Sequence, residues 1–378
     1  MILTFENIAH YLLEKGLISL DSIIAGEFSV RDNSSRNTNF VVNQEFQPAY
    51  LIKQVKAKDR EKTYTMRIEA TCYWLANNDE QYRVLKGFLP AYFEYDYLNH
   101  ILILELLSDT QSLYSYHYQA KKFPEAIGRQ LAELLASYHT YQQGEIQQSP
   151  SYQLFNKQQP WIFSLPAKKM EDWKNSHMGT VEKQILQLIY ENSEFLDLLQ
   201  PVTAEWEEKS LIHGDVKFPN FLINNSYEND EQPDIRLIDW ELADIGDPLW
   251  DVAAIFQNYL SLWVSSELEQ QAPAQSRKPI FRIEQLQPSI EAFWERYTAC
   301  LGWDEPQARE HLLKAVRFTA LKLMHTCFEA SPYSQQLQPY SAKMLQLSLN
   351  LLKYPDDAIR NLLGITKPII HASRYSTI

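Results

Sequence analysis

The sequence predicts an α+β chain with two lobes. We expect a small N-terminal lobe built on a sheet and one main helix, followed by a larger, mostly helical C-terminal lobe. Strand-like apolar runs are concentrated in residues 1–107, whereas helical apolar spacing dominates residues 108–378. The length of 378 residues also exceeds that of a typical single domain.

The elements of the small lobe follow from apolar spacing. Residues 4–15 place apolar side chains on one helical face, and Gly16 lies where such a helix would end. Residues 18–42 alternate around a very polar centre, which favours a hairpin with a long polar turn. A further helix is expected at 64–76, and strands are expected at 49–55, 91–97 and 101–107.

The large lobe is predicted from longer helical patterns. Residues 142–180 are rich in Gln, Pro and Lys and indicate an irregular insertion, with Trp161, Phe163 and Trp173 packed beneath it. The polar residues 265–285 are expected to form a loop. Helices are expected at 126–141, 181–199, 249–262, 290–300, 308–329 and 340–351.

Composition limits the classes of function. The net charge of −13 argues against a general binder of nucleic acid or anionic membrane, because such partners require basic surfaces. Cys72, Cys300 and Cys327 lack metal-ligand spacing and are expected to be free thiols in a reducing compartment. There is no signal-peptide pattern and no stretch near the roughly 18 apolar residues that span a bilayer. These features predict a cytoplasmic protein and leave its oligomeric state open.

The segment from 211 to 241 carries the most chemical information. Asp215, Asn220 and Asp239 lie between apolar runs that are expected to be buried strands. Their spacing suits phosphoryl transfer, in which divalent cations are held against a nucleotide triphosphate while a carboxylate orients an attacking hydroxyl. The alternative is a pair of strands with ordinary turn Asp and Asn residues.

Each candidate residue of this segment has an expected role. Asp215 would orient the acceptor, and Lys217 would reach the transferring phosphate. Asn220 and Asp239 offer oxygen ligands to Mg²⁺. His213 is expected to be architectural, because no second His or Cys nearby suggests a metal site.

The small lobe supplies candidates for nucleotide binding. Lys53 ends an apolar strand, and Glu69 on the predicted helix could pair with it and direct its ammonium toward phosphates. An exposed Lys and an unrelated surface Glu are the alternative. Glu105 and Leu107 end the last strand of this lobe, where their backbone groups are expected to meet adenine, an assignment that rests on order along the chain.

With these motifs the chain resembles the aminoglycoside phosphotransferase and choline kinase family, which shares the bilobal protein-kinase-like fold. The resemblance implies an antiparallel sheet in the small lobe, ATP or alternatively GTP as the nucleotide, and Mg²⁺. It also implies that Asp251 is a buried carboxylate that holds the catalytic loop through backbone hydrogen bonds, with Asp247 supporting the same turn. The competing interpretation, which can hold at the same time, is an acidic residue favoured at a helix N-terminus. The matching segments are Lys53, Glu69, 104–106, 213–220, 238–241 and 246–251.

Two departures from protein kinases bear on function. No Gly occurs between Gly26 and Gly87, so residues 29–39 would have to cover phosphates with Ser and Asn side chains and backbone. Only 11 residues separate Asp239 from Asp251, which leaves no room for a long segment that docks peptides. We therefore expect a kinase that phosphorylates a hydroxyl of a small molecule.

Two other functions remain open. The Gly-less segment would suit a nucleotide-binding pseudokinase or scaffold, although the complete set of Asp215, Asn220 and Asp239 argues against it. Adenylyl transfer onto a protein would use the same metal ligands. Glu241 and Asp244 could meet an amine of the acceptor, and Glu241 could equally stabilise a loop. The acceptor itself, whether aminoglycoside-, choline- or sugar-like, is not named by the sequence.

Overall fold

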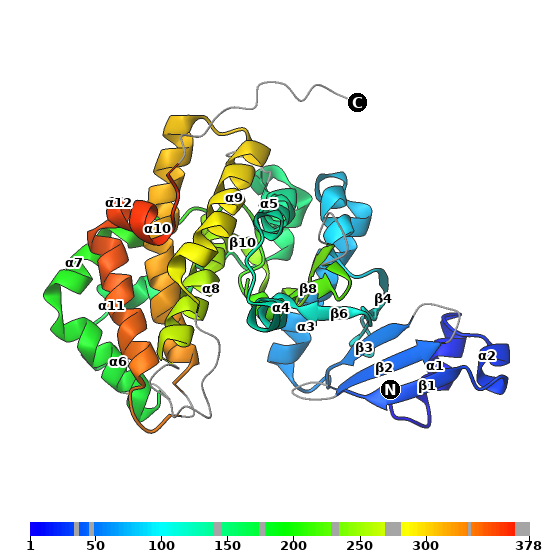
Figure 1. Cartoon of the computed structure of the whole chain (residues 1–378). Coiled ribbons are helices and arrows are strands. Elements are labelled where there is room, and N and C mark those ends of the chain that lie inside the picture. Colours follow the sequence, from blue (N-terminus) through cyan, green and yellow to red (C-terminus); the bar gives the residue numbers. More distant parts are fainter. Residues whose placement is uncertain are drawn as a thin grey trace, which may run out of the picture. The chain divides into compact units, whose positions relative to one another are not determined.

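The chain divides into two compact units (Figure 1). The first consists of Met1–Ser112 with Asn220–Ala243, and the second of Leu113–Pro219 with Asp244–Ile378. The segment 220–243 thus groups with the N-terminal residues, and the predicted division at residue 108 stays a prediction. This computed structural model describes residues 1–33, 38–44, 49–139, 146–173, 178–227, 234–268, 281–331 and 334–366.

The first unit is built on a five-stranded sheet. Its strand order is β1-β2-β3-β5-β4, and every neighbouring pair is antiparallel. The predicted α+β class, with a sheet in this unit and mostly helices in the remainder, is confirmed. The strands are β1 (Phe28–Asp32), β2 (Thr38–Gln44), β3 (Tyr50–Gln54), β4 (Tyr92–Asp96) and β5 (Ile101–Glu105).

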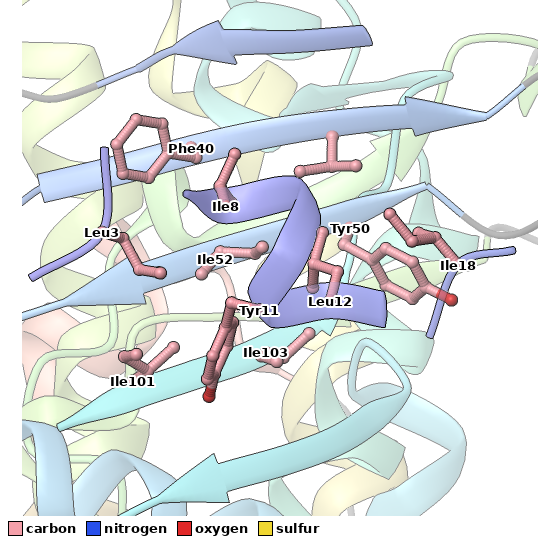
Figure 2. Packing of buried hydrophobic residues seen from close by; sticks show 11 residues of the cluster. Leu3, Ile8, Tyr11, Leu12, Ile18, Phe40, Tyr50, Ile52, Ile101 and Ile103 are labelled. Carbon is pink, nitrogen blue, oxygen red and sulfur yellow. The ribbon is translucent and has the colours of Figure 1, made fainter. Parts of the chain in front are cut away.

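Helix α1 (Ile8–Glu14) covers one face of this sheet (Figure 2). Tyr50 and Ile52 of β3 belong to the buried cluster beneath α1, as do Ile101 and Ile103 of β5. Successive side chains of a strand point to opposite faces. The neighbours of these residues, Lys53 among them, therefore face away from α1.

A long helix and a second, smaller sheet complete the first unit. Asp59 caps α3 (Arg60–Asn78) by accepting a hydrogen bond from the Lys62 N–H at 3.2 Å. The 3₁₀-helix η1 (Glu80–Phe88) leads from α3 to β4. The smaller sheet has the order β6-β8-β9, with β6 (Thr110–Ser112), β8 (Phe221–Asn224) and β9 (Ile235–Leu237), and it is followed by η9 (Trp240–Leu242).

The second unit is mostly helical. A two-stranded antiparallel sheet pairs β7 (Ser210–Ile212) with β10 (Asp244–Gly246). The predicted insertion forms 3₁₀ turns, η2 (Ile146–Gln148), η3 (Pro150–Leu154), η4 (Trp161–Ala167) and η5 (Met170–Trp173), with 140–145 and 174–177 outside the described residues. Another 3₁₀ turn, η6 (Thr203–Glu205), lies further along the chain. The helices are α4 (Leu113–Ala120), α5 (Glu125–His139), α6 (Thr180–Glu191), α7 (Ser193–Val202), α8 (Leu249–Leu268), α9 (Ile283–Leu301), α10 (Glu305–Glu329), α11 (Pro339–Lys353) and α12 (Pro355–Asp357) with a π-helical turn Ala358–Leu362.

The structure differs from the predicted elements in several places. A short helix, α2 (Leu20–Ile24), capped by Ser19, precedes the expected hairpin. The single helix expected at 181–199 is broken at Asn192, whose side chain accepts from the Phe195 N–H at 3.1 Å and starts α7. The expected loop 265–285 is shortened from both sides by α8 and α9, and 269–280 lie outside the described residues. Within the part of the chain that the structure describes, no helix has the length and apolar character needed to cross a membrane.

Candidate active site

The candidate residues form two sets, one in each unit. The set in the second unit is His213, Asp215, Lys217, Asp247 and Asp251. The set in the first unit is Lys53, Glu69, Glu105, Leu107, Asn220 and Asp239.

Lys53 is the centre of a charged group in the first unit. Its Nζ lies 2.7 Å from Glu69 Oε1 and 3.8 Å from Asp239 Oδ1. Glu69 comes from the middle of α3, and its side chain is almost fully buried. The structure thus brings together the Lys and Glu that were connected only by their order in the sequence, and it adds Asp239 to them.

Opposing effects set the charge of Lys53. Burial disfavours its ammonium, but the carboxylates of Glu69 and Asp239 outweigh burial and raise the pKa of Lys53 above its ordinary value. Lys53 is therefore a cation. Glu69 fixes its direction from the buried side, while the Asp239 side chain is 35% exposed.

These groups line a cleft of about 360 Å³ in the first unit. Its apolar walls come from Leu51, Leu104, Leu222 and Ile238, and Lys53, Glu69 and Asp239 provide its charged part. An apolar slot beside a fixed cation suits a ligand that has a flat apolar part and an anionic part.

The end of β5 also lines this cleft. The Glu105 N–H donates to the Ala91 carbonyl at 2.8 Å, so the sheet already occupies it. The Glu105 carboxylate accepts from the Ala91 N–H at 2.9 Å. The Leu107 N–H has no hydrogen-bond partner among the described residues, while its carbonyl accepts from Thr110 Oγ1 at 2.9 Å. Leu107 is therefore the residue here whose N–H is available to a bound base.

Asn220 and Asp239 lie at the same end of the β8–β9 ladder. The Ile238 N–H donates to the Asn220 carbonyl at 3.0 Å, which continues the register of these strands. Asp239 has a φ of 70°, a left-handed conformation that Asp tolerates better than most residues. Amide and carboxylate oxygens are ligands that Mg²⁺ accepts. No group of three or more His, Cys, Asp or Glu could hold a metal in the described ranges.

The segment expected to cover phosphates forms part of β1 and β2. Its tip, 34–37, lies outside the described residues. Asn39 on β2 is the register partner of Lys53 and lines the cleft. One polar residue of this Gly-less segment therefore does reach the cleft.

The loop that carries Asp215 follows β7 in the second unit. Gly214 has a φ of 78°, a conformation that side chains disfavour. The buried His213 ring accepts the Asp215 N–H at Nδ1, 3.3 Å away, which is an architectural contact. Lys217 Nζ lies 2.5 Å from Asp215 Oδ2, so the two charged candidates of this loop are paired.

Asp251 holds this loop from the first turn of α8. Its buried carboxylate accepts from the His213 N–H at 2.6 Å and from the Gly214 N–H at 3.1 Å. Burial opposes its ionisation, but hydrogen bonding and charge from His139 and His213 outweigh burial and hold the pKa of Asp251 below its ordinary range. The Asp251 carboxylate thus fixes the loop by accepting hydrogen bonds from backbone N–H groups that would otherwise lack a partner.

Asp247 supports the chain just before α8. Its carboxylate accepts from the Leu249 N–H at 3.0 Å and from the Glu207 N–H at 3.2 Å. Lys314 on α10 lies 2.6 Å from it. These contacts connect the end of β10 to the segment that precedes β7.

Several contacts of the loop were not predicted from the sequence. Tyr138 Oη donates to Asp251 at 3.1 Å, and His139 Nε2 lies 3.5 Å from the same carboxylate. Asn258 accepts from the Phe218 N–H at 2.9 Å. Lys322 donates to the Gly214 carbonyl at 3.2 Å. Their only sequence signal is that each is a polar or charged group within an apolar helical pattern.

Asp244, which the sequence suggested could meet an amine of the acceptor, makes backbone contacts in the second unit. Its carboxylate accepts from the Lys157 N–H at 2.6 Å, the Gln158 N–H at 2.8 Å and the Ile245 N–H at 2.8 Å. These bonds connect the insertion to β10, and the expected contact with an amine stays a prediction. Glu241 lines the cleft of the first unit, where its charge acts on Lys53.

His117 on α4 makes stability depend on pH. It is buried against Phe123, Phe218 and Tyr259, and its Nδ1–H donates to the Lys122 carbonyl at 2.7 Å. Burial lowers the pKa of His117 to about 4 from 6.5. The stability due to neutral His117 is therefore full above pH 6.5 and is lost as the pH falls toward 4, by roughly 3 kcal/mol in total.

We expect His117→Phe to flatten this part of the pH dependence. Urea unfolding from pH 7 to 4 measures it as the difference in unfolding free energy from the unsubstituted protein. His10→Gln, which removes an exposed histidine on α1, is the control. Equal slopes for His117→Phe and the control would contradict the prediction.

The fold is protein-kinase-like, and the class of protein is a phosphotransferase. The chain belongs to the phosphotransferase enzyme family, whose model matches residues 29–293. The family resemblance inferred from the motifs is thereby confirmed. No curated protein sequence matches the chain.

Solved structures show the same fold at low sequence identity. An ethanolamine kinase from Plasmodium vivax has a TM-score of 0.53 and 15% identity, covering 90% of this chain and 87% of its own. A protein from Ralstonia eutropha assigned as an aminoglycoside phosphotransferase has a TM-score of 0.50 and 14% identity, with 94% and 98% covered. A microcompartment-associated aminopropanol kinase has a TM-score of 0.50 and 15% identity, with 95% and 98% covered.

Proposed function

We propose that the protein transfers the γ-phosphoryl group of ATP to a hydroxyl of a small molecule, releasing ADP. The observation that carries the proposal is the buried Lys53–Glu69 pair beside Asp239 in the cleft of the first unit. A cation held in this way suits the phosphates of a nucleotide whose base occupies the apolar part of the cleft. GTP is the alternative nucleotide.

The residues of the first unit would bind the nucleotide. Leu107 would donate its N–H to the base, and Lys53 would contact the phosphates, held in direction by Glu69. Asn220 and Asp239 would hold Mg²⁺, which neutralises charge on the phosphates when bound.

The residues of the second unit would act on the acceptor. Asp215 would accept a hydrogen bond from the attacking hydroxyl and take its proton as the O–P bond forms. Lys217, now paired with Asp215, would turn to the transferring phosphate. The helical region after residue 255 and the insertion 142–180 would form the acceptor pocket.

The short span between Asp239 and Asp251 supports a small acceptor. In this span the structure has only η9, β10 and the start of α8. Ethanolamine and aminopropanol kinases are among the similar structures, so amino alcohols belong in the panel of acceptors to test. The panel also includes choline, aminoglycosides and sugars. We propose that the protein is cytoplasmic. We also propose that it acts without a membrane or nucleic-acid partner.

We expect ATP with Mg²⁺ to raise the melting temperature by on the order of 5 °C at saturation. Asp239→Ala should remove the Mg²⁺-dependent part of this rise, because it deletes the only carboxylate among the two proposed ligands. Differential scanning fluorimetry with ATP, with and without Mg²⁺, measures the effect. The matched control is Asp234→Ala, an exposed Asp just before β9 that pairs with Arg236.

The outcomes separate the proposed functions. No response to any nucleotide would contradict both the kinase and the scaffold. Nucleotide binding with no modified acceptor in the panel would favour the scaffold, which the Gly-less β1–β2 segment leaves open. Mass spectrometry of the product distinguishes phosphoryl from adenylyl transfer.

A further inference from the structure

Lys322 is a buried lysine that contacts the loop carrying Asp215. It lies in the middle of α10, between residues of the helical core, and is 8% exposed. Its Nζ donates to the Gly214 carbonyl at 3.2 Å and lies 4.0 Å from the centre of the Trp250 ring. Both contacts lie within the second unit.

A lysine at such a position is costly unless its charge is used. Lys is among the residues least often fully buried, and an aliphatic side chain of similar length would fill the space without desolvating a charge. Burial lowers the pKa of Lys322, while the carboxylates of Asp251, Asp215 and Glu329 favour its charged form and Lys217 opposes it. The Trp250 face adds a cation–π contact.

The contacts of Lys322 complement those of Asp251. Asp251 on α8 accepts from the N–H groups of His213 and Gly214, and Lys322 on α10 donates to the carbonyl of Gly214. The peptide groups on both sides of Gly214 are thus held by opposite charges from two helices. Gly214 has the backbone freedom of a glycine at positive φ, and the next residue is Asp215.

We propose that Lys322 is a positioning residue that fixes the peptide between Gly214 and Asp215 and so directs the Asp215 carboxylate. The inference rests on the proposed function only in the role given to Asp215. Lys322 itself touches the backbone and the Trp250 ring and takes no part in bond making.

A purely structural lysine would behave differently. If Lys322 only filled space, a neutral side chain of similar length would leave the loop unchanged. If it only stabilised the fold, replacing it would lower the unfolding midpoint and loosen the whole second unit together. A positioning residue instead loosens the loop and leaves global stability nearly unchanged.

The test compares amide hydrogen exchange of the peptide 211–218 in the full chain with and without Lys322→Met. We expect exchange in this peptide to become about tenfold faster, because a charge-assisted hydrogen bond to the loop is lost. Peptides from the first unit should not change. Lys343→Met, a partly exposed lysine on α11 paired with Glu267, is the matched control and should change nothing in 211–218.

Two further variants keep the test decisive. Lys322→Arg retains charge and donors and should preserve most of the protection, whereas Lys322→Gln, for use if the Met variant does not fold, should lose part of it. Where turnover is measurable, Lys322→Met should lower kcat at least tenfold with the KM for ATP unchanged. Unaltered exchange in 211–218, or a loss that only follows global unfolding, would overturn the proposal. Because hydrogen exchange needs no acceptor, this result is independent of whether the protein proves to be a kinase.

Discussion

Asp215→Asn is expected to reduce phosphoryl transfer about a thousandfold while leaving nucleotide binding intact. The amide has nearly the shape of the carboxylate but cannot take the proton of the attacking hydroxyl. The substitution also removes the pairing with Lys217 Nζ, 2.5 Å away. Since both side chains are partly exposed, this lost pair should change stability by less than about 1 kcal/mol.

The measurement is the rate of product formation from ATP with the acceptor found in the panel, at saturating Mg²⁺. Asp197→Asn, an exposed residue on α7, is the control for a lost surface charge and should retain full activity. Thermal stabilisation by ATP should be the same in all three proteins. Retention of more than about a tenth of the activity by Asp215→Asn would show that another group acts as the base.

The spacing of polar and charged residues was more informative than any single element. Asp215, Asn220 and Asp239 could be selected because polar residues at these intervals interrupt apolar strands. Lys53 and Glu69 were connected by order alone, and the structure places them 2.7 Å apart. Pairing of this kind is predictable when both residues belong to strongly patterned elements, here β3 and α3.

The support beneath the Asp215 loop was not predictable in the same way. Tyr138, Asn258 and Lys322 lie far from the loop in sequence and on three different helices, so only the packing of those helices brings them to it. Lys322 did leave a trace, because it is a charge within the otherwise apolar stretch 320–324. Helical patterns tolerate such residues too often for this trace to identify a contact.

The predicted helix boundaries were wrong where a capping side chain determines the first residue of a helix. Asn192 and Ser19 each accept a backbone N–H three residues later and begin a helix, although apolar spacing alone continues through them or misses the helix. The helical ends of α8 and α9 carry polar residues because they are partly exposed there. The polar residues in 265–285 therefore indicate exposed helix ends as well as a loop.

Asp251→Ala is expected to destabilise the second unit by about 3–5 kcal/mol, because it removes the acceptor for two buried N–H groups and for Tyr138. Asp251→Asn keeps one oxygen and should cost less. Urea unfolding followed by tryptophan fluorescence measures the change. Asp357→Ala, which breaks an exposed pair with Arg360, is the control and should stay within about 0.5 kcal/mol of the unsubstituted protein.

The pH dependence provides a second check on Asp251. Because its folded pKa lies below the ordinary value, its stabilising effect is present above the unfolded pKa of about 4 and is lost as the pH falls further. Unfolding free energies of the Asp251→Asn variant and the unsubstituted protein should therefore converge at acid pH. A constant difference down to pH 3 would show that the ionised carboxylate is not what holds the loop.

Substitutions of Asp251 and Asp215 are then distinguished by whether they change stability and turnover together or turnover alone. Asp251 contacts the N–H groups of His213 and Gly214 and no group that would react, so its removal should lower stability and turnover in the same variant. Asp215 makes a side-chain contact with the partly exposed Lys217, and we expect its replacement to lower turnover alone. If Asp251→Asn retained full turnover despite lower stability, the direction of the Asp215 carboxylate would have to be set by the remaining contacts of the loop.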